Sequence, residues 1–273
     1  VFDIDKLAKW VAISDVMGAW HGFGFANMRF YFNPVTTKFE PVPDDNYNER
    51  AYNFAAPFRL FRLNDSYNEG TFLKQLFSDY VFTKRYLKEL ERVSKATYLE
   101  SIFEEFSRGI SSRNNILAKD YPLYNFLLDS KNYTYQNAQN LRAILSPHKG
   151  VQSYIKNKTK KGLLLQLANN KTVPMEILHL TNKTNNVFPI QSSQKFILGG
   201  RDFNTPVSYK NLFFEYDGAD NLTEVQQDGL SLVYRVLGTS VNRKAQIFPF
   251  QAFETNIVKY QKFNPQKTFF NNF

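Results

Sequence analysis

The sequence predicts an α+β fold in two parts, a mainly helical region followed by a small antiparallel β-sandwich. The 273 residues are 43% hydrophobic and 16% aromatic, which is enough apolar material for one large or two ordinary domains. Apolar residues recur at helical spacing before residue 150, and short β-rich runs follow Pro147. We therefore expect one domain over residues 1–150 and an immunoglobulin-like β-sandwich over residues 151–273.

The first region opens with a helix and a hairpin. Residues 5–20 place apolar side chains along one side of a helix, with an Asp in front as a cap and Gly18 near the end. Residues 30–32 and 38–42 are typical of two short strands around an Asn-Pro turn. The next residues form a loop that is rich in Asp and Asn.

The rest of the first region is predicted to be helical. From residue 71 onward, apolar side chains recur at i, i+3, i+4 and i+7, and the pattern repeats up to Val93. Thr97 and Glu100 have the spacing of a capping box, which predicts a helix from there to about Gly109. Further helices are expected over residues 111–118, 122–129 and 135–145.

The second region contains six apolar runs that predict strands. Clusters of Asn, Gly, Asp and Pro separate the runs, and none shows a helical period. Many short strands with turns between them favour a small antiparallel sandwich. The expected strands cover residues 162–167, 173–180, 195–198, 211–216, 230–237 and 244–248.

Composition excludes several classes of protein. The absence of cysteine excludes a disulfide framework and a thiolate metal site, and leaves the compartment open. No apolar run reaches the roughly 18–20 residues of a membrane span. The net charge is +9, but the densest basic run, residues 156–161, has no aromatic residue within it. A solvated linker is the favoured interpretation of this run, so we predict no nucleic-acid partner.

The chemistry is expected in residues 20–46. A polar loop with His21 and Asn27 precedes a short aromatic strand, a turn and a second loop with Asp44 and Asp45. Protein kinases present their catalytic loop and then their metal-binding Asp in this order. Each feature also has a structural reading, because His21 suits a half-buried histidine and the Asp pair suits a turn.

The motifs in this stretch resemble the spore-coat CotH family of atypical protein kinases. In that family a W-D-G-x-x-H-N loop is followed by Y-x-x-P-x-x-G-K and then by P-x-D. Residues 20–22, Trp-His-Gly, are similar to W-D-G, and Asn27 matches the Asn that ends the loop. Residues 31–38 match the turn, and residues 43–45, Pro-Asp-Asp, match P-x-D. The resemblance covers about half of the chain, including the helical block up to residue 150.

The resemblance implies a kinase-like C-lobe that transfers a phosphoryl group from ATP, with Mg²⁺ or Mn²⁺, to a protein hydroxyl. Asp45 would be the metal-binding carboxylate, with Asp44 beside it, and Asn27 would lie near the bound nucleotide. The family's nucleotide-clamping elements would precede Val1, so we expect this chain to be a piece of a longer protein. The resemblance also implies an extracytoplasmic or cell-surface location.

The chain departs from the family at the catalytic position. His21 stands where the family has its catalytic Asp, and an imidazole accepts a proton but attracts a metal-bound nucleotide less than a carboxylate does. Asp15, six residues before His21, is a second candidate carboxylate for catalysis. Two readings stay open, an active kinase and an inactive kinase-like scaffold whose β domain binds a surface glycan or protein.

Overall fold

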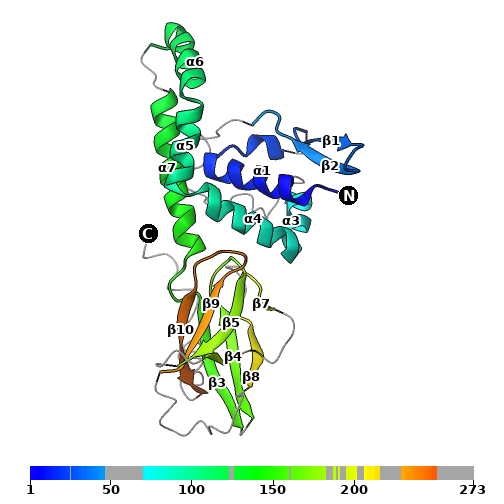
Figure 1. Cartoon of the computed structure of the whole chain (residues 1–273), viewed down its shortest axis with the longest axis vertical. Coiled ribbons are helices and arrows are strands. Elements are labelled where there is room, and N and C mark those ends of the chain that lie inside the picture. Colours follow the sequence, from blue (N-terminus) through cyan, green and yellow to red (C-terminus); the bar gives the residue numbers. More distant parts are fainter. Residues whose placement is uncertain are drawn as a thin grey trace, which may run out of the picture. The chain divides into compact units, whose positions relative to one another are not determined.

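The chain is α+β and divides into two compact units. The helical unit comprises Val1–Ser146 and Leu237–Ser240, and the β unit comprises Pro147–Val236 and Val241–Phe273. Figure 1 shows the computed structural model, in which the helices belong to the first unit and β3 to β10 to the second. The structure describes residues 1–24, 26–46, 70–122, 126–159, 161–182, 187–188, 190, 195–201, 206–215 and 229–250.

The helical unit is built around α1 (Ile4–Met17), which packs on α4 (Tyr80–Val93) and α7 (Phe126–Leu145). Apolar side chains at helical spacing fill the contacts and are fully buried, because this face of each helix is removed from water. The buried set includes Leu7, Val11, Leu87, Leu90 and Leu141. The remaining helices are α3 (Gly70–Ser78), α5 (Ala96–Glu105) and α6 (Ser107–Asp120).

Both ends of α1 follow the sequence signals. The Asp3 carboxylate accepts the backbone N–H of Lys6 at 3.0 Å, so it satisfies one of the first free donors of the helix. Gly18 ends the helix with a φ of 67°, a conformation that a residue without a Cβ adopts at little cost. A Cβ at this position would also lie 2.7 Å from the ring of Tyr133 on α7.

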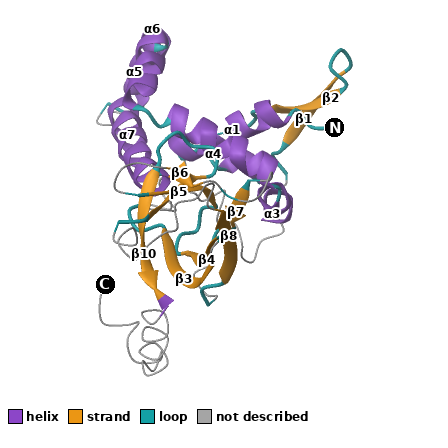
Figure 2. Ribbon diagram, turned by 60° about the horizontal axis from the view of Figure 1, so that its bottom comes forward, coloured by secondary structure: helices purple, strands orange, loops and turns teal. Residues whose placement is uncertain are grey.

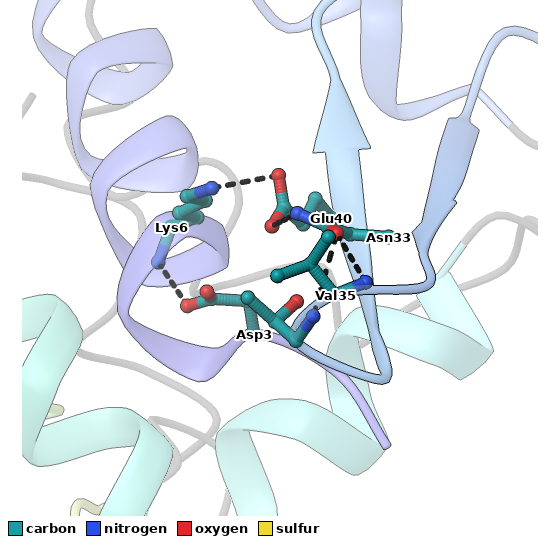
Figure 3. Close-up of polar contacts among 6 residues, drawn as sticks. Asp3, Lys6, Asn33, Val35 and Glu40 are labelled. Carbon is teal, nitrogen blue, oxygen red and sulfur yellow. Dashed lines mark hydrogen bonds and ion pairs between the residues drawn. The ribbon is translucent and has the colours of Figure 1, made fainter.

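Strands β1 (Arg29–Asn33) and β2 (Lys38–Val42) form the predicted hairpin, which Figure 2 shows projecting from the helices. Figure 3 shows how the hairpin is fixed to the start of α1. Glu40 lies 2.6 Å from Lys6 Nζ and accepts the amide N–H of Asn33 at 2.9 Å. The hydrogen bond from Lys6 and then that from Asn33 lower the pKa of Glu40. The turn is closed by Asn33 Oδ1, which accepts the N–H of Val35 at 2.9 Å.

The boundaries of α5 and α6 differ from the sequence prediction. Helix α5 begins at Ala96, after an N-cap Lys95 whose side chain makes no capping bond, so the predicted capping box at Thr97 is wrong. Thr97 is the second residue of the helix, so its side chain is not at the N-cap position that a capping box requires. Helix α5 ends at Glu105, and α6 follows after Phe106 instead of the chain leaving the helix near Gly109.

The β unit is one nearly closed sheet in which most neighbours are antiparallel. Its strand order is β6-β5-β9-β10-β3-β4-β8, and β7 pairs with β5 on the same edge as β6. A bridge between Ile190 and Phe214 brings the two ends of this order together. The bounds are β3 Val151–Thr159, β4 Gly162–Asn169, β5 Met175–Thr181, β6 Val187–Phe188, β7 Phe196–Leu198, β8 Tyr209–Glu215, β9 Ser231–Val236 and β10 Arg243–Pro249.

Two features of this sheet correct the sequence prediction. Strand β10 pairs in parallel with β3, so the sheet is not purely antiparallel. The basic run at residues 156–161 is not a linker, because it covers the end of β3 and the turn into β4. Its exposed Lys and Asn side chains hide the strand pattern, while the register with β4 continues past a bulge between Ile155 and Asn157.

None of the helices in the described ranges is long and apolar enough to cross a lipid bilayer.

Candidate functional site

The two loops that flank the β1–β2 hairpin meet at His21 and Asp45. His21 opens the short 3₁₀ helix η1 (His21–Phe23), and Asp45 lies in the loop after β2. The Nε2 atom of His21 is 3.1 Å from Asp45 Oδ2. Both side chains remain accessible, with 34% of the His21 side chain and 53% of the Asp45 side chain exposed. The hairpin therefore brings an imidazole and a carboxylate, 24 positions apart in the sequence, into one accessible contact.

Asn27 holds the shape of the His21 loop. Its side-chain N–H donates to the backbone carbonyl of His21 at 3.1 Å, and its backbone N–H donates to the carbonyl of Gly24 at 2.8 Å. The N–H of Gly24 in turn donates to the carbonyl of His21 at 3.0 Å. These bonds fix the backbone beneath the imidazole, which is what a pre-organised site requires.

The second loop is shaped by its own side chains. The Oδ1 atom of Asp44 accepts the N–H of Asp45 at 3.1 Å, a local bond that is typical of Asp in turns. Asp45 has a φ of 48°, in the left-handed region that Asp tolerates better than most residues. Asp44 thus supports the backbone that presents Asp45.

Gly22 allows the two loops to approach each other. A Cβ on Gly22 would lie 1.9 Å from Asn46 Oδ1 and 2.8 Å from the backbone oxygen of Asp44, so any larger residue would displace the second loop. The Oδ1 atom of Asn46 is buried and accepts no hydrogen bond from the described residues. Buried amide oxygens in proteins are usually hydrogen-bonded or bound to an ion.

Asp15 lies apart from this contact, in the core of the helical unit. It is 1% exposed, accepts the indole N–H of Trp20 at 3.0 Å and accepts the hydroxyl of Tyr86. Burial, and then the Asp15 carboxylate, raise the pKa of Tyr86 well above its ordinary value. Asn137 on α7 donates to the backbone oxygens of Asp15 and Val16 at 2.6 and 3.0 Å. The carboxylate therefore ties α1 to α4 and to the residue before His21.

The structure thus brings together His21, Asn27, Asp44 and Asp45 and places Asp15 elsewhere. Sequence reasoning missed Gly22 and Asn46 as parts of this junction. The sequence signal for Gly22 was its place in the Trp-His-Gly motif of residues 20–22. A glycine at such a position indicates that another part of the backbone approaches closely. No sequence signal marks Asn46, since its role depends on where the second loop folds back.

Oxygen donors of two side chains lie at the loop junction. Asp45 has a carboxylate and Asn46 an amide oxygen, and oxygen atoms of these kinds are the ligands that Mg²⁺ prefers in proteins. Within the described ranges, no three side chains of His, Asp or Glu gather into a closed metal site. Phosphoryl-transfer sites need only one or two protein carboxylates, because the phosphates and water complete the coordination.

Comparison of the chain with protein-family models and with curated proteins found no match.

Proposed function

We propose that this chain contributes the catalytic loops of an ATP-dependent phosphotransferase that acts on a protein hydroxyl at the cell surface. The observation that carries the proposal is the 3.1 Å contact between His21 and Asp45, which joins the two loops where a kinase places its catalytic and metal-binding residues. The motif resemblance to the CotH kinases supports it, and so does the accessibility of both side chains.

In this proposal His21 is the proton acceptor. The Asp45 carboxylate contacts Nε2 and orients the imidazole, as a carboxylate does in other nucleophile-activating dyads, and the imidazole accepts the proton of the attacking hydroxyl. Asn27 holds the loop that carries the imidazole through the carbonyl of His21. We also propose that the helical unit has the arrangement of a protein-kinase C-lobe.

Asp45 has two carboxylate oxygens, and Oδ2 is the one that contacts His21. Asp45 and the side-chain oxygen of Asn46 would hold Mg²⁺ or Mn²⁺, with Asp44 supporting the loop through its bond to the N–H of Asp45. A bound divalent ion would neutralise the charge that develops on the transferred phosphoryl group. The protein's own task is to hold the imidazole and the carboxylate at fixed separation, which the hairpin register and the Gly22 contact achieve.

The test is transfer of labelled phosphate from ATP to protein, measured with Mg²⁺ and with Mn²⁺. Because the resemblance implies that nucleotide-clamping elements precede Val1, the assay uses the natural full-length protein. We expect metal-dependent labelling that falls at least 100-fold in Asp45→Asn and in His21→Gln, since both remove a group that acts on the reacting atoms. Asp120→Asn is the matched control, because Asp120 is an exposed carboxylate at the end of α6.

Labelling that is equal in the parent protein and in Asp45→Asn would refute the proposal. Loss of labelling in Asp45→Asn but not in His21→Gln would support the role of Asp45 at the metal and would refute the role of His21 as the base. Circular dichroism and the unfolding midpoint of each variant show whether a loss of activity reflects a loss of folding.

A second candidate function is a kinase-like scaffold without catalysis, and the burial of Asp15 favours it. Asp15 is saturated by Trp20 and Tyr86, so it does not replace the catalytic Asp that the family has at position 21. In this case the β unit carries the function. Background labelling in all variants, together with binding of a ligand by the β unit, is the result expected for a scaffold.

We propose for this case that the nearly closed sheet of the β unit is flattened into an immunoglobulin-like sandwich. Strands β3, β4 and β8 form one side, and β5, β9 and β10 form the other. Strand β10 joins the sides, because residues 243–246 pair with β9 and residues 247–249 pair in parallel with β3. Two mainly antiparallel sheets of three or four strands are the architecture of immunoglobulin-like binding modules.

A further inference from the structure

The positive charge of the chain is concentrated in the β unit. Of the 34 Lys and Arg residues, 16 lie in Pro147–Val236 and Val241–Phe273, against 8 of the 25 Asp and Glu residues. The β unit therefore has a formal net charge of +8, and the helical unit only +1. A fold of this size does not need such an excess, which destabilises the compact state by self-repulsion and favours negatively charged partners.

One face of the sheet organises part of this charge around a buried carboxylate. Glu176 on β5 is 1% exposed and points away from the core, because its neighbours Met175 and Ile177 face inward. Its Oε2 accepts Nε–H of Arg235 on β9 at 2.7 Å, and its Oε1 forms an ion pair with Lys195 Nζ at 3.0 Å. Burial opposes ionisation, but Arg235 and then Lys195 outweigh it and lower the pKa of Glu176.

This arrangement orients the guanidinium of Arg235. Glu176 holds Nε, the inner edge of the planar fork, so the outer edge with its two terminal nitrogens is turned away from the carboxylate. The Arg235 side chain is 27% exposed and Lys195 is 61% exposed, so two cations meet solvent above one buried anion. A fixed guanidinium with an accessible outer edge is the group that binds carboxylate, sulfate or phosphate in a bidentate manner.

The next position along β9 adds more positive charge. Val233 lies between His179 on β5 and Lys244 on β10 in the strand register. Lys244 is exposed. Burial, and then the charge of Lys244, lower the pKa of His179. Lys244 thus adds a second exposed cation on the same face as Arg235.

The third position along β9 supplies neutral polar groups. Ser231 lies between Thr181 on β5 and Gln246 on β10, and Gln246 is exposed. Alternate residues of a strand are about 7 Å apart, so the face from Arg235 to Ser231 is about 14 Å long. The Thr181 side chain is buried, so the face presents a cationic end and the exposed amide of Gln246, which match an acidic group and a hydroxyl of a sugar.

We propose that the outer face of β5, β9 and β10 binds an anionic polysaccharide, with the outer edge of Arg235 on an acidic group and Lys195 and Lys244 beside it. The polymeric ligand matches the distribution of charge, because +8 over the whole β unit exceeds what one small ion requires. This site lies in a different unit from the loops of the proposed phosphotransferase and does not depend on that activity.

The test is equilibrium binding of the full chain to five polymers at 0.1 M salt. The polymers are polygalacturonate, which carries carboxylates, dextran sulfate, neutral dextran, polyglutamate and duplex DNA. We expect binding to one or both acidic polysaccharides. Tighter binding of polygalacturonate would indicate carboxylate recognition, and tighter binding of dextran sulfate would indicate sulfate recognition. No binding to either acidic polysaccharide overturns the proposal, and so does equal or tighter binding to neutral dextran, polyglutamate or duplex DNA.

Two variants separate a built site from general charge attraction. Arg235→Lys keeps the net charge but removes the planar fork, so we expect affinity to fall at least tenfold. Lys210→Gln removes one charge from the exposed part of β8, away from this face, and we expect less than a threefold loss. A loss in Arg235→Lys that does not exceed the loss in Lys210→Gln would show charge attraction only and would overturn the assignment. If Arg235→Lys does not fold, Lys244→Gln and Lys195→Gln, both at exposed positions, replace it under the same criterion.

Discussion

Removal of the Asp15 carboxylate should destabilise the helical unit without touching the accessible contact between His21 and Asp45. Asp15 is 1% exposed and accepts hydrogen bonds from Trp20 and Tyr86. In Asp15→Ala both donors stay buried without an acceptor. Each orphaned donor costs about 1–3 kcal/mol, so we expect a loss of about 2–5 kcal/mol in the free energy of unfolding.

The assay is urea unfolding followed by tryptophan fluorescence. The chain has two tryptophans, Trp10 and Trp20, and both lie in the helical unit, so the signal reports on that unit. Tyr86→Phe is the matched partner variant, because it removes one donor and leaves the ring. We expect it to cost about 1–3 kcal/mol, and the double variant should cost less than the sum of the two single variants.

The double-mutant cycle decides whether the network exists as described. Strictly additive losses would show that Asp15 and Tyr86 do not interact, which would refute the reasoning. A loss below about 1 kcal/mol in Asp15→Ala would likewise show that the buried donors find other acceptors. Asp15→Asn keeps one acceptor oxygen, so its stability should lie between those of the parent and the Ala variant.

Three further predictions concern the loop junction and the β unit. Gly22→Ala should displace Asn46, lower stability by about 1–3 kcal/mol and reduce phosphate transfer at least tenfold, as measured by urea unfolding and by the labelling assay. Tyr234→Phe should cost about 1–2 kcal/mol in thermal unfolding of the β unit, because the buried hydroxyl accepts the N–H of Gly150 at 2.8 Å. The lowered pKa of Glu176 contributes stability that is fully present above its ordinary value of 4.5 and is lost as the pH falls through the folded-state pKa. Unfolding midpoints measured between pH 7 and pH 3 should therefore fall less steeply below pH 4.5 in Glu176→Gln than in the parent, and parallel curves would contradict the ion-pair assignment.

Local signals in the sequence predicted the first part of the helical unit well. The Asp before α1 and Gly18 after it act within a few residues, so α1 spans Ile4–Met17, one residue before the predicted start at 5 and three residues before the predicted end at 20. The Asn-Pro turn likewise fixed the β1–β2 hairpin and its register. Signals of this kind need no partner from elsewhere in the chain.

Other local patterns in the sequence gave wrong predictions, because contacts with distant parts of the chain decided the structure there. The capping-box spacing at Thr97 did not set the start of α5, and the basic residues of β3 concealed a strand that β4 and β10 hold in the sheet. The backbone hydrogen bonds of a strand form whatever its side chains are, so the exposed end of a strand can be entirely polar. The parallel pair of β3 and β10 joins residues about 94 positions apart, and no local pattern encodes it.

The sequence by itself determined the residue types of the candidate site and their order, with His21, Asn27, Asp44 and Asp45 on either side of a hairpin. Only the tertiary structure decided which carboxylate does what. Asp15 and Asp45 look alike in the sequence, but α4 and Trp20 bury the first among hydrogen-bond donors, while the hairpin delivers the second to an accessible imidazole. The physical reason is that the role of a carboxylate depends on its solvation and on the donors around it, and both are supplied by residues distant in the sequence.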